Sequence, residues 1–125
     1  MKKLLIAAGL LAAASTSAYA EDVTGKLVLY TSQPNADAQA TVDAFTAAHP
    51  GVEVEWVRDG TTKIMAKLLA EFEAGAPKPD VLLIADMVTM ESLKQEGRLM
   101  AHEAADVSAY DPAIMDKDKS YFSTK

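Results

Sequence analysis

Cysteine is absent from the 125 residues of this sequence, and histidine occurs twice. The first absence excludes disulfide scaffolds, thiolate zinc sites and catalysis by a thiol. Neither histidine has a second histidine at a spacing typical of metal ligands. The nucleophile-elbow motif Gly-x-Ser-x-Gly and the phosphate-binding motif Gly-x-x-x-x-Gly-Lys-Ser/Thr are missing as well. The sequence therefore predicts no catalytic residue, no metal site and no cofactor.

Basic residues are outnumbered, with 12 Lys and Arg against 18 Asp and Glu and a net charge of −6. Lys2 and Lys3 are the charged residues of the first twenty, so residues 21–125 hold ten basic and eighteen acidic residues and a net charge of −8. This excess of acid argues against a nucleic acid or an anionic membrane surface as a partner. About half of the residues are hydrophobic, which excludes a disordered chain and fits one small domain.

One long hydrophobic run is present, and it lies at the N-terminus. Lys2 and Lys3 precede an apolar run over residues 4–14, which a segment of small residues ending in Ala18-x-Ala20 follows. This order predicts a secretory signal peptide over residues 1–20, cleaved after Ala20, and export to a bacterial periplasm. The run is shorter than the roughly 20 residues that span a bilayer, so we expect no membrane-spanning segment.

The remaining chain alternates short apolar runs with amphipathic stretches. We expect strands over residues 26–31, 52–57 and 81–84, and helices over residues 36–48, 62–74 and 89–96. Strands separated by helices of this length pair in parallel with right-handed crossovers. The predicted fold class is therefore α/β, with a parallel βαβαβα sheet.

Ligands of open parallel α/β sheets bind beyond the carboxyl ends of the strands. The three loops that leave these ends carry hydroxyls, amides and carboxylates, and the predicted ligand-binding residues are Ser32, Gln33, Thr61, Thr62 and Asp86. The two threonines open a helix, whose free N–H groups and dipole suit an anion. Plain helix capping by Thr61 or Thr62, which needs no ligand, is the simpler explanation of this segment taken alone. Asp86 could likewise bind a ligand or cap the helix that follows it.

Other polar features have simpler interpretations. Asn35 is suited to cap the first helix, and residues 101–109 fit a weak helix. Residues 112–125 are polar and without a pattern. The acidic pairs Glu71 with Glu73 and Asp116 with Asp118 are interpreted as solvated charge.

Four segments together resemble the amino-terminal lobe of the periplasmic solute-binding proteins of ABC importers, most closely the branch that binds iron(III) and its relatives that bind phosphonates and other small anions. The matching segments are residues 29–32, 45–52, 60–68 and 79–82. In this family, two α/β lobes of a type II-like fold close on a ligand, and the closed form docks on a membrane permease. The resemblance implies that residues 21–125 are an incomplete amino-terminal lobe without the second lobe.

The resemblance implies a non-enzymatic, monomeric protein that captures a small solute in the periplasm for an ABC permease in the inner membrane. Pro34 stands where the iron-binding branch often has a histidine, and Ala85 with Asp86 beside it stands where that branch often has a glutamate. We therefore expect an organic or phosphonate-like anion, with ferric iron as the alternative. A small exported α/β hydrolase and a truncated fragment without a function of its own are the further alternatives.

Overall fold

A computed structural model describes residues 23–123 of the chain. The predicted signal peptide over residues 1–20 lies outside the described residues. In chain order the elements are β1 (Gly25–Thr31), α1 (Asn35–Ala48), β2 (Val52–Arg58), α2 (Thr61–Glu73), β3 (Val81–Leu83), α3 (Met87–Gln95) and the 3-10 helix η1 (Pro112–Ile114). The predicted alternation of strand and helix is confirmed, with boundaries that differ by one to two residues.

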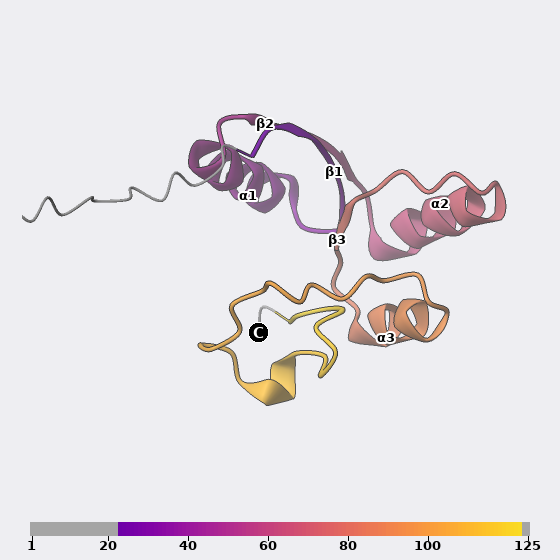
Figure 1. Cartoon of the computed structure of the whole chain (residues 1–125). Helices are drawn as coiled ribbons and strands as arrows, with labels where there is room; N and C mark the ends of the chain where they lie inside the picture. The colour runs from indigo at the N-terminus through magenta and orange to yellow at the C-terminus, as the bar shows by residue number, and fades with distance from the viewer. Residues whose placement is uncertain (1–22, 124–125) are drawn as a thin grey trace, which may run out of the picture.

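The three strands form one parallel sheet in the order β2-β1-β3. Leu29 in the central strand pairs with Trp56 on one side and with Val81 on the other. The connection from β1 to β2, which contains α1, leads to one neighbour of β1. The connection from β2 to β3, which contains α2, crosses back over β1 to its other neighbour. Right-handed crossovers in opposite directions place their helices on opposite faces of the sheet, and Figure 1 shows α1 and α2 on opposite sides of the strands. The predicted α/β fold class is confirmed.

The core lies where the two helices meet the central strand. Its buried hydrophobic side chains come from β1, β2 and all three α-helices, and they are Leu29, Tyr30, Ala38, Val42, Val52, Ile64, Leu68 and Leu93. These residues include the apolar stripes at helical spacing in α1 and α2 that make both helices amphipathic. Burial of these stripes against the sheet fixes the position of the loops at its carboxyl edge.

Two helices end at a glycine in the left-handed region. Gly75 has a φ of 68° and Gly97 a φ of 69°, a conformation that other residues adopt at a cost. The amides of Gly97 and Arg98 donate to the carbonyls of Lys94 and Leu93, and the same pattern of bonds closes α2. Both ends are Schellman motifs, which explains why both helices stop at a glycine.

The predicted cap of α1 is wrong. Asn35 is the first helical residue, and the capping position belongs to Pro34, which has no side-chain capping bond. The fixed φ of proline already places the chain for helix entry, so Asn35 joins the helix instead of preceding it.

Beyond α3 the chain is structured without a long helix. The weak helix predicted over residues 101–109 is wrong, since the structure has only turns there. Residues predicted to be without a pattern form η1, followed by an antiparallel bridge between Met115 and Phe122. This carboxyl-terminal segment folds back beside α3 (Figure 1), so it lies near the carboxyl edge of the sheet.

Within residues 23–123, none of the helices has the length and apolar character needed to cross a bilayer.

Candidate functional site

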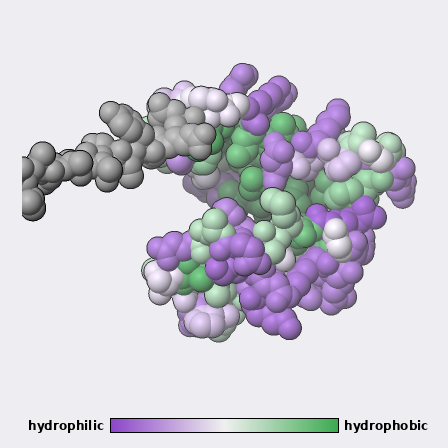
Figure 2. Space-filling model, in the orientation of Figure 1, coloured by the Kyte–Doolittle hydropathy of each residue, from purple (hydrophilic) through white to green (hydrophobic). Residues whose placement is uncertain are grey.

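A cavity of about 470 Å³ opens at the carboxyl edge of the sheet. The loops after β1 and β3, the first turns of α1 and α3, and the carboxyl-terminal segment all contribute to its wall. The lining residues are Ser32, Gln33, Pro34, Asp37, Leu82, Leu83, Ile84, Ala85, Asp86, Met87, Met90, Tyr121, Phe122 and Ser123. Figure 2 shows a hollow between the sheet with its helices and the carboxyl-terminal segment. The edge predicted from topology thus carries a concave surface of a size suited to a small solute.

Ser32 joins the two strands at this edge. Its backbone N–H donates to the carbonyl of Leu83 over 3.0 Å, and its hydroxyl oxygen accepts from the amide of Ala85 over 3.1 Å. Buried Thr31 adds a hydroxyl bond to the Leu83 carbonyl. The loops after β1 and β3 are therefore tied together by short hydrogen bonds, so this part of the cavity wall is preformed.

Gln33 lies beside a positive charge. The Nε of Arg58, at the end of β2, donates to the backbone carbonyl of Gln33 over 2.7 Å. The side-chain oxygen of Gln33 accepts a longer bond of 3.4 Å from the hydroxyl of Thr41 in α1. The side chain of Gln33 thus contributes an amide to the cavity wall. Its backbone carbonyl binds the Arg58 guanidinium, which therefore lies at the same edge of the sheet.

Asp86 caps α3. Its Oδ1 accepts from the amides of Val88 over 3.0 Å and Thr89 over 3.3 Å, and its Oδ2 accepts from the Thr89 hydroxyl. The Thr89 hydroxyl, followed by the amides of Thr89 and Val88, lowers the pKa of Asp86 below its ordinary value despite partial desolvation. The carboxylate is therefore ionised at neutral pH, and the capping role is confirmed. Because Asp86 also lines the cavity, capping and solute binding are compatible here.

Thr61 and Thr62 lie apart from the other predicted residues. They are the first two residues of α2 and are not among those that line the cavity. Gly60 occupies the capping position, and no side chain caps the helix. The first backbone amides of α2 thus have no side-chain acceptor. The loop that leads into α2 lies next to Gln33, because Arg58 at the end of β2 donates to the Gln33 carbonyl.

Sequence reasoning missed the wall formed by the carboxyl-terminal segment. Tyr121 and Phe122 line the cavity, and the Phe122 ring lies 5.9 Å from that of Tyr110. The signal for this wall is two consecutive aromatic residues within an otherwise polar stretch. Such a pair seldom stays fully solvated when a core is available to it.

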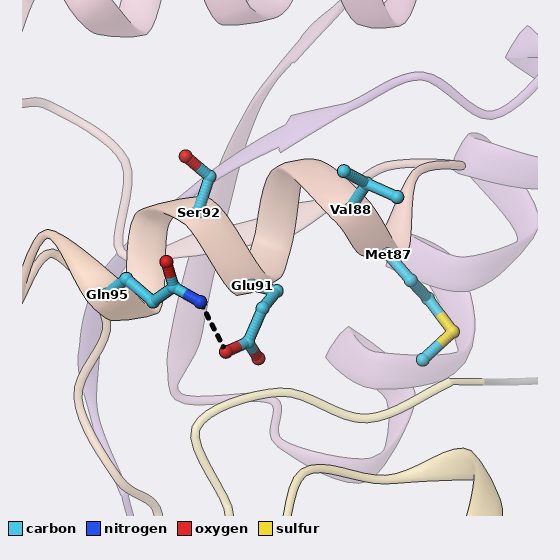
Figure 3. A pocket seen from close by; sticks show the side chains of 5 residues that line it. All are labelled: Met87, Val88, Glu91, Ser92 and Gln95. Carbon is cyan, nitrogen blue, oxygen red and sulfur yellow. Dashed lines mark hydrogen bonds between the residues drawn. The ribbon is translucent and has the colours of Figure 1, made fainter.

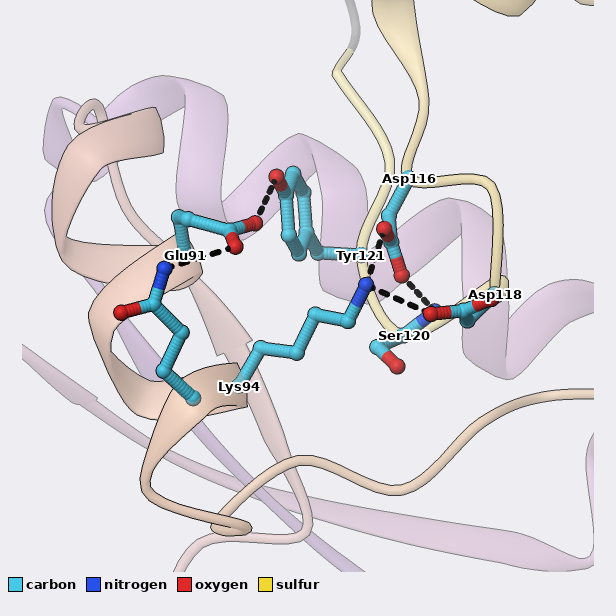
Figure 4. A network of polar contacts seen from close by, with 7 residues as sticks. Glu91, Lys94, Asp116, Asp118, Ser120 and Tyr121 are labelled. Carbon is cyan, nitrogen blue, oxygen red and sulfur yellow. Dashed lines mark hydrogen bonds and ion pairs between the residues drawn. The ribbon is translucent and has the colours of Figure 1, made fainter.

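A polar network attaches this segment to α3 (Figure 4). The Lys94 ammonium lies 2.5 Å from the carboxylate of Asp116 and 2.8 Å from that of Asp118. The hydroxyl of Tyr121 donates to Glu91 over 2.7 Å. The interpretation as solvated charge is wrong for Asp116, because Lys94, 22 residues earlier, brings it into a buried position. Asp118 pairs with the same lysine, but its side chain is 56% exposed.

The same correction applies to Glu71. Its carboxylate accepts from the hydroxyl of Tyr30 over 2.7 Å and pairs with Lys67 over 3.0 Å. Its side chain is 11% exposed. Glu71 therefore links α2 to the central strand.

The charged side chains that line the cavity are the carboxylates of Asp37 and Asp86, and no Lys or Arg of residues 23–123 lines it. Across that same part of the chain, no group of three His, Asp or Glu residues is placed to hold a metal ion. The cavity wall thus combines carboxylates, an amide and hydroxyls with aromatic and thioether surface.

A second, shallower depression of about 360 Å³ runs along α3 (Figure 3). It is lined by Met87, Val88, Glu91, Ser92 and Gln95. Met87 is 48% and Val88 80% exposed. Met87 lines both hollows, so the start of α3 lies between them.

The sequence of the chain matches the model of a known protein family. Residues 30–123 match the family described as bacterial extracellular solute-binding protein. No curated protein matches the chain. The matched range starts in β1 and includes the carboxyl-terminal segment that completes the cavity, so the match covers every loop that lines it.

Proposed function

The chain belongs to the family of bacterial extracellular solute-binding proteins, and from this premise we propose that it is the substrate-binding component of an ABC importer. The expected resemblance is confirmed at the level of the family. Such proteins have a substrate-binding role for importers and are generally not enzymes. The single observation that supports solute capture at a defined place is the cavity of about 470 Å³ at the carboxyl edge of the sheet.

Export follows from the same proposal. A signal peptide over residues 1–20, removed after Ala20, would deliver the protein to the periplasm as a monomer that meets the permease of the inner membrane. Mass spectrometry of protein recovered from the periplasm tests this step. The expected mature N-terminus is Glu21.

For the solute, we propose a small organic or phosphonate-like anion. Two observations support it: Arg58 is bonded to the carbonyl of Gln33 over 2.7 Å, and α2 starts without a side-chain cap. Helix N-termini bind anions through their amides and dipole. The anion would lie near Gln33 and be held by Thr61, Thr62 and the guanidinium, with Ser32 and Asp86 shaping the adjoining cavity.

Calorimetric titration of the purified protein with methylphosphonate and with inorganic phosphate tests this assignment. The variants Arg58→Gln, Thr61→Ala and Thr62→Ala are each expected to weaken binding. Lys26→Met is the matched control, because Lys26 carries a positive charge at the start of β1 and is paired with Glu55. Unchanged affinity in all three site variants would show that the anion is not bound there.

A second candidate within the same class is favoured by the carboxylates of Asp37 and Asp86. These acceptors suit a solute with hydroxyl or amino groups, which aromatic rings can cover. A polyol and a polyamine therefore belong in the same titration series. Binding of either one, with loss of affinity in Asp37→Asn, would favour this candidate over the anion.

Ferric iron is the remaining alternative. Fe³⁺ takes hard oxygen ligands, and Asp86 is the predicted residue able to supply one. Titration with ferric citrate, followed by its absorbance, distinguishes iron from the other solutes. The hydrolase alternative is tested by assaying ester and phosphoester turnover, which a binding protein is expected to lack.

A further inference from the structure

The cavity has two walls of different origin. One wall consists of the loops after β1 and β3, joined by the bonds of Ser32 to Leu83 and Ala85. The other wall is formed by Tyr121 and Phe122, which lie outside the strands of the sheet and the helices. The width of the cavity therefore depends on what holds residues 115–122, the clamp segment, in place.

The clamp segment is attached to α3 by two side chains of that helix. Lys94 binds Asp116 and Asp118 over 2.5 and 2.8 Å, and Glu91 accepts from the hydroxyl of Tyr121 over 2.7 Å. Lys94 and Glu91 are three residues apart, so they lie on the same face of α3. Figure 4 shows both side chains directed from the helix towards the segment.

Asp116 fixes the turn that leads to the aromatic pair. Its Oδ2 accepts from the amide of Ser120 over 3.1 Å, and its own amide donates to the carbonyl of Tyr121 over 3.0 Å. Its side chain is 5% exposed and that of Lys94 20%. A largely buried carboxylate that loses its cation is left uncompensated, so the turn must rearrange if Lys94 is removed.

We propose that Lys94 and Glu91 are positioning residues for solute binding, holding the clamp segment so that the Tyr121 and Phe122 rings contact the bound solute. The contact with a solute rests on the proposed function. The positioning of the rings is independent of that function, because they share the cavity wall with Met87 and Met90 whether or not a solute is present.

Nuclear magnetic resonance of the protein labelled at its methionine methyl groups tests the positioning without a solute. Residues 21–125 hold five methionines, so the spectrum is simple to assign, and each variant to methionine adds one further signal. In Lys94→Met we expect the signals of Met87 and Met90 to shift, because the neighbouring aromatic rings move. Lys94→Arg, which keeps a cation for both carboxylates, should restore much of the wild-type pattern. Lys26→Met, which breaks the exposed pair with Glu55, should leave both signals in place.

Tyr121→Phe provides a milder variant in case Lys94→Met does not fold. It removes the bond to Glu91 and keeps the ring, so the protein should stay folded while the same two signals shift. The proposal is overturned if the signals of Met87 and Met90 stay at their wild-type positions in folded Lys94→Met. If Lys94→Met is unfolded, the same result in Tyr121→Phe overturns it.

Titration with whichever of methylphosphonate, a polyol or a polyamine binds the wild type tests the contact with solute. Loss of the two ion pairs with Asp116 and Asp118 is expected to weaken affinity about tenfold in Lys94→Met, with recovery in Lys94→Arg. If the methionine signals shift while the affinity is unchanged, the rings do not contact the solute, and this part of the proposal is overturned. Failure of the wild type to bind any probe would count against the proposed function, while the methionine signals still decide the positioning.

Discussion

The hydroxyl of Tyr30, in the central strand, donates a 2.7 Å hydrogen bond to the carboxylate of Glu71 in α2. Tyr30 is 1% exposed, so this bond lies at the boundary between core and helix surface. Glu71 also accepts from the amide of Lys78 over 3.1 Å. One carboxylate thus connects the central strand, α2 and the chain that leads into β3.

Tyr30→Phe should lower the free energy of unfolding by about 1.5–3 kcal/mol, the usual effect of deleting a hydrogen bond to a charged group. Urea denaturation at neutral pH measures the change. Tyr110→Phe is the matched control, because Tyr110 is 40% exposed and its substitution should change stability little. Equal effects of the two substitutions would show that the bond to Glu71 contributes nothing specific.

Acid should destabilise the fold partly through Asp116. Burial by itself raises the pKa of this carboxyl, but the bonds from Lys94 and the Ser120 amide outweigh burial and bring the pKa below its ordinary value of 3.8. A lowered pKa in the folded state means that the stabilisation is present above the ordinary value and is lost as the pH falls through the folded value.

The test compares urea midpoints of wild type and Asp116→Asn at several pH values. The variant should be less stable at neutral pH, and its midpoint should fall less steeply than that of wild type below about pH 4. Asp118→Asn is the control, because the Asp118 side chain is 56% exposed and its pair with Lys94 should be weak. Identical acid profiles for wild type and Asp116→Asn would contradict the role of Asp116.

The cap of α3 should be measurable on its own. Asp86→Ala removes an acceptor for the amides of Val88 and Thr89 and should cost about 1 kcal/mol of stability. Asp86→Ser keeps a capping oxygen and should recover most of this loss in the same urea experiment. A serine variant as unstable as the alanine variant would mean that Asp86 acts through something other than capping.

The end of α3 depends on a backbone conformation. Gly97 has a φ of 69°, and alanine in the left-handed region costs about 1–2 kcal/mol, so Gly97→Ala should lower the thermal midpoint. Gly60→Ala is the matched control, since Gly60 has a φ of −60° and no atom within 4 Å of an added Cβ. The prediction fails if both glycine variants melt at the same temperature.

The sequence allowed the sheet and the edge that carries the cavity to be predicted, because both follow from local periodicity. The apolar runs of β1 and β3 alternate with the apolar stripes of α1 and α2, and this order suffices for a parallel sheet. Ser32, Gln33 and Asp86 were placed at the cavity by the rule that loops leaving parallel strands share one edge.

The other wall of the cavity could not be predicted in this way. Asp116 is isolated in sequence from its partner Lys94, so a local pattern shows only a charge in a polar stretch. The same limit applies to Tyr121, whose partner Glu91 is 30 residues earlier. Contacts of side chains across such separations depend on the completed fold, which periodicity does not encode.

The order β2-β1-β3 also has a kinetic consequence. The first strand of the described chain is the central one, and its bond from Thr31 to Leu83 joins residues 52 positions apart. A nascent chain can form α1 and α2 from local contacts, but β1 gains its second neighbour only after β3 has been synthesised. The cavity, whose wall includes Leu82, Leu83 and Ala85, is therefore completed only after β3 has been synthesised, later than the pair of β1 and β2.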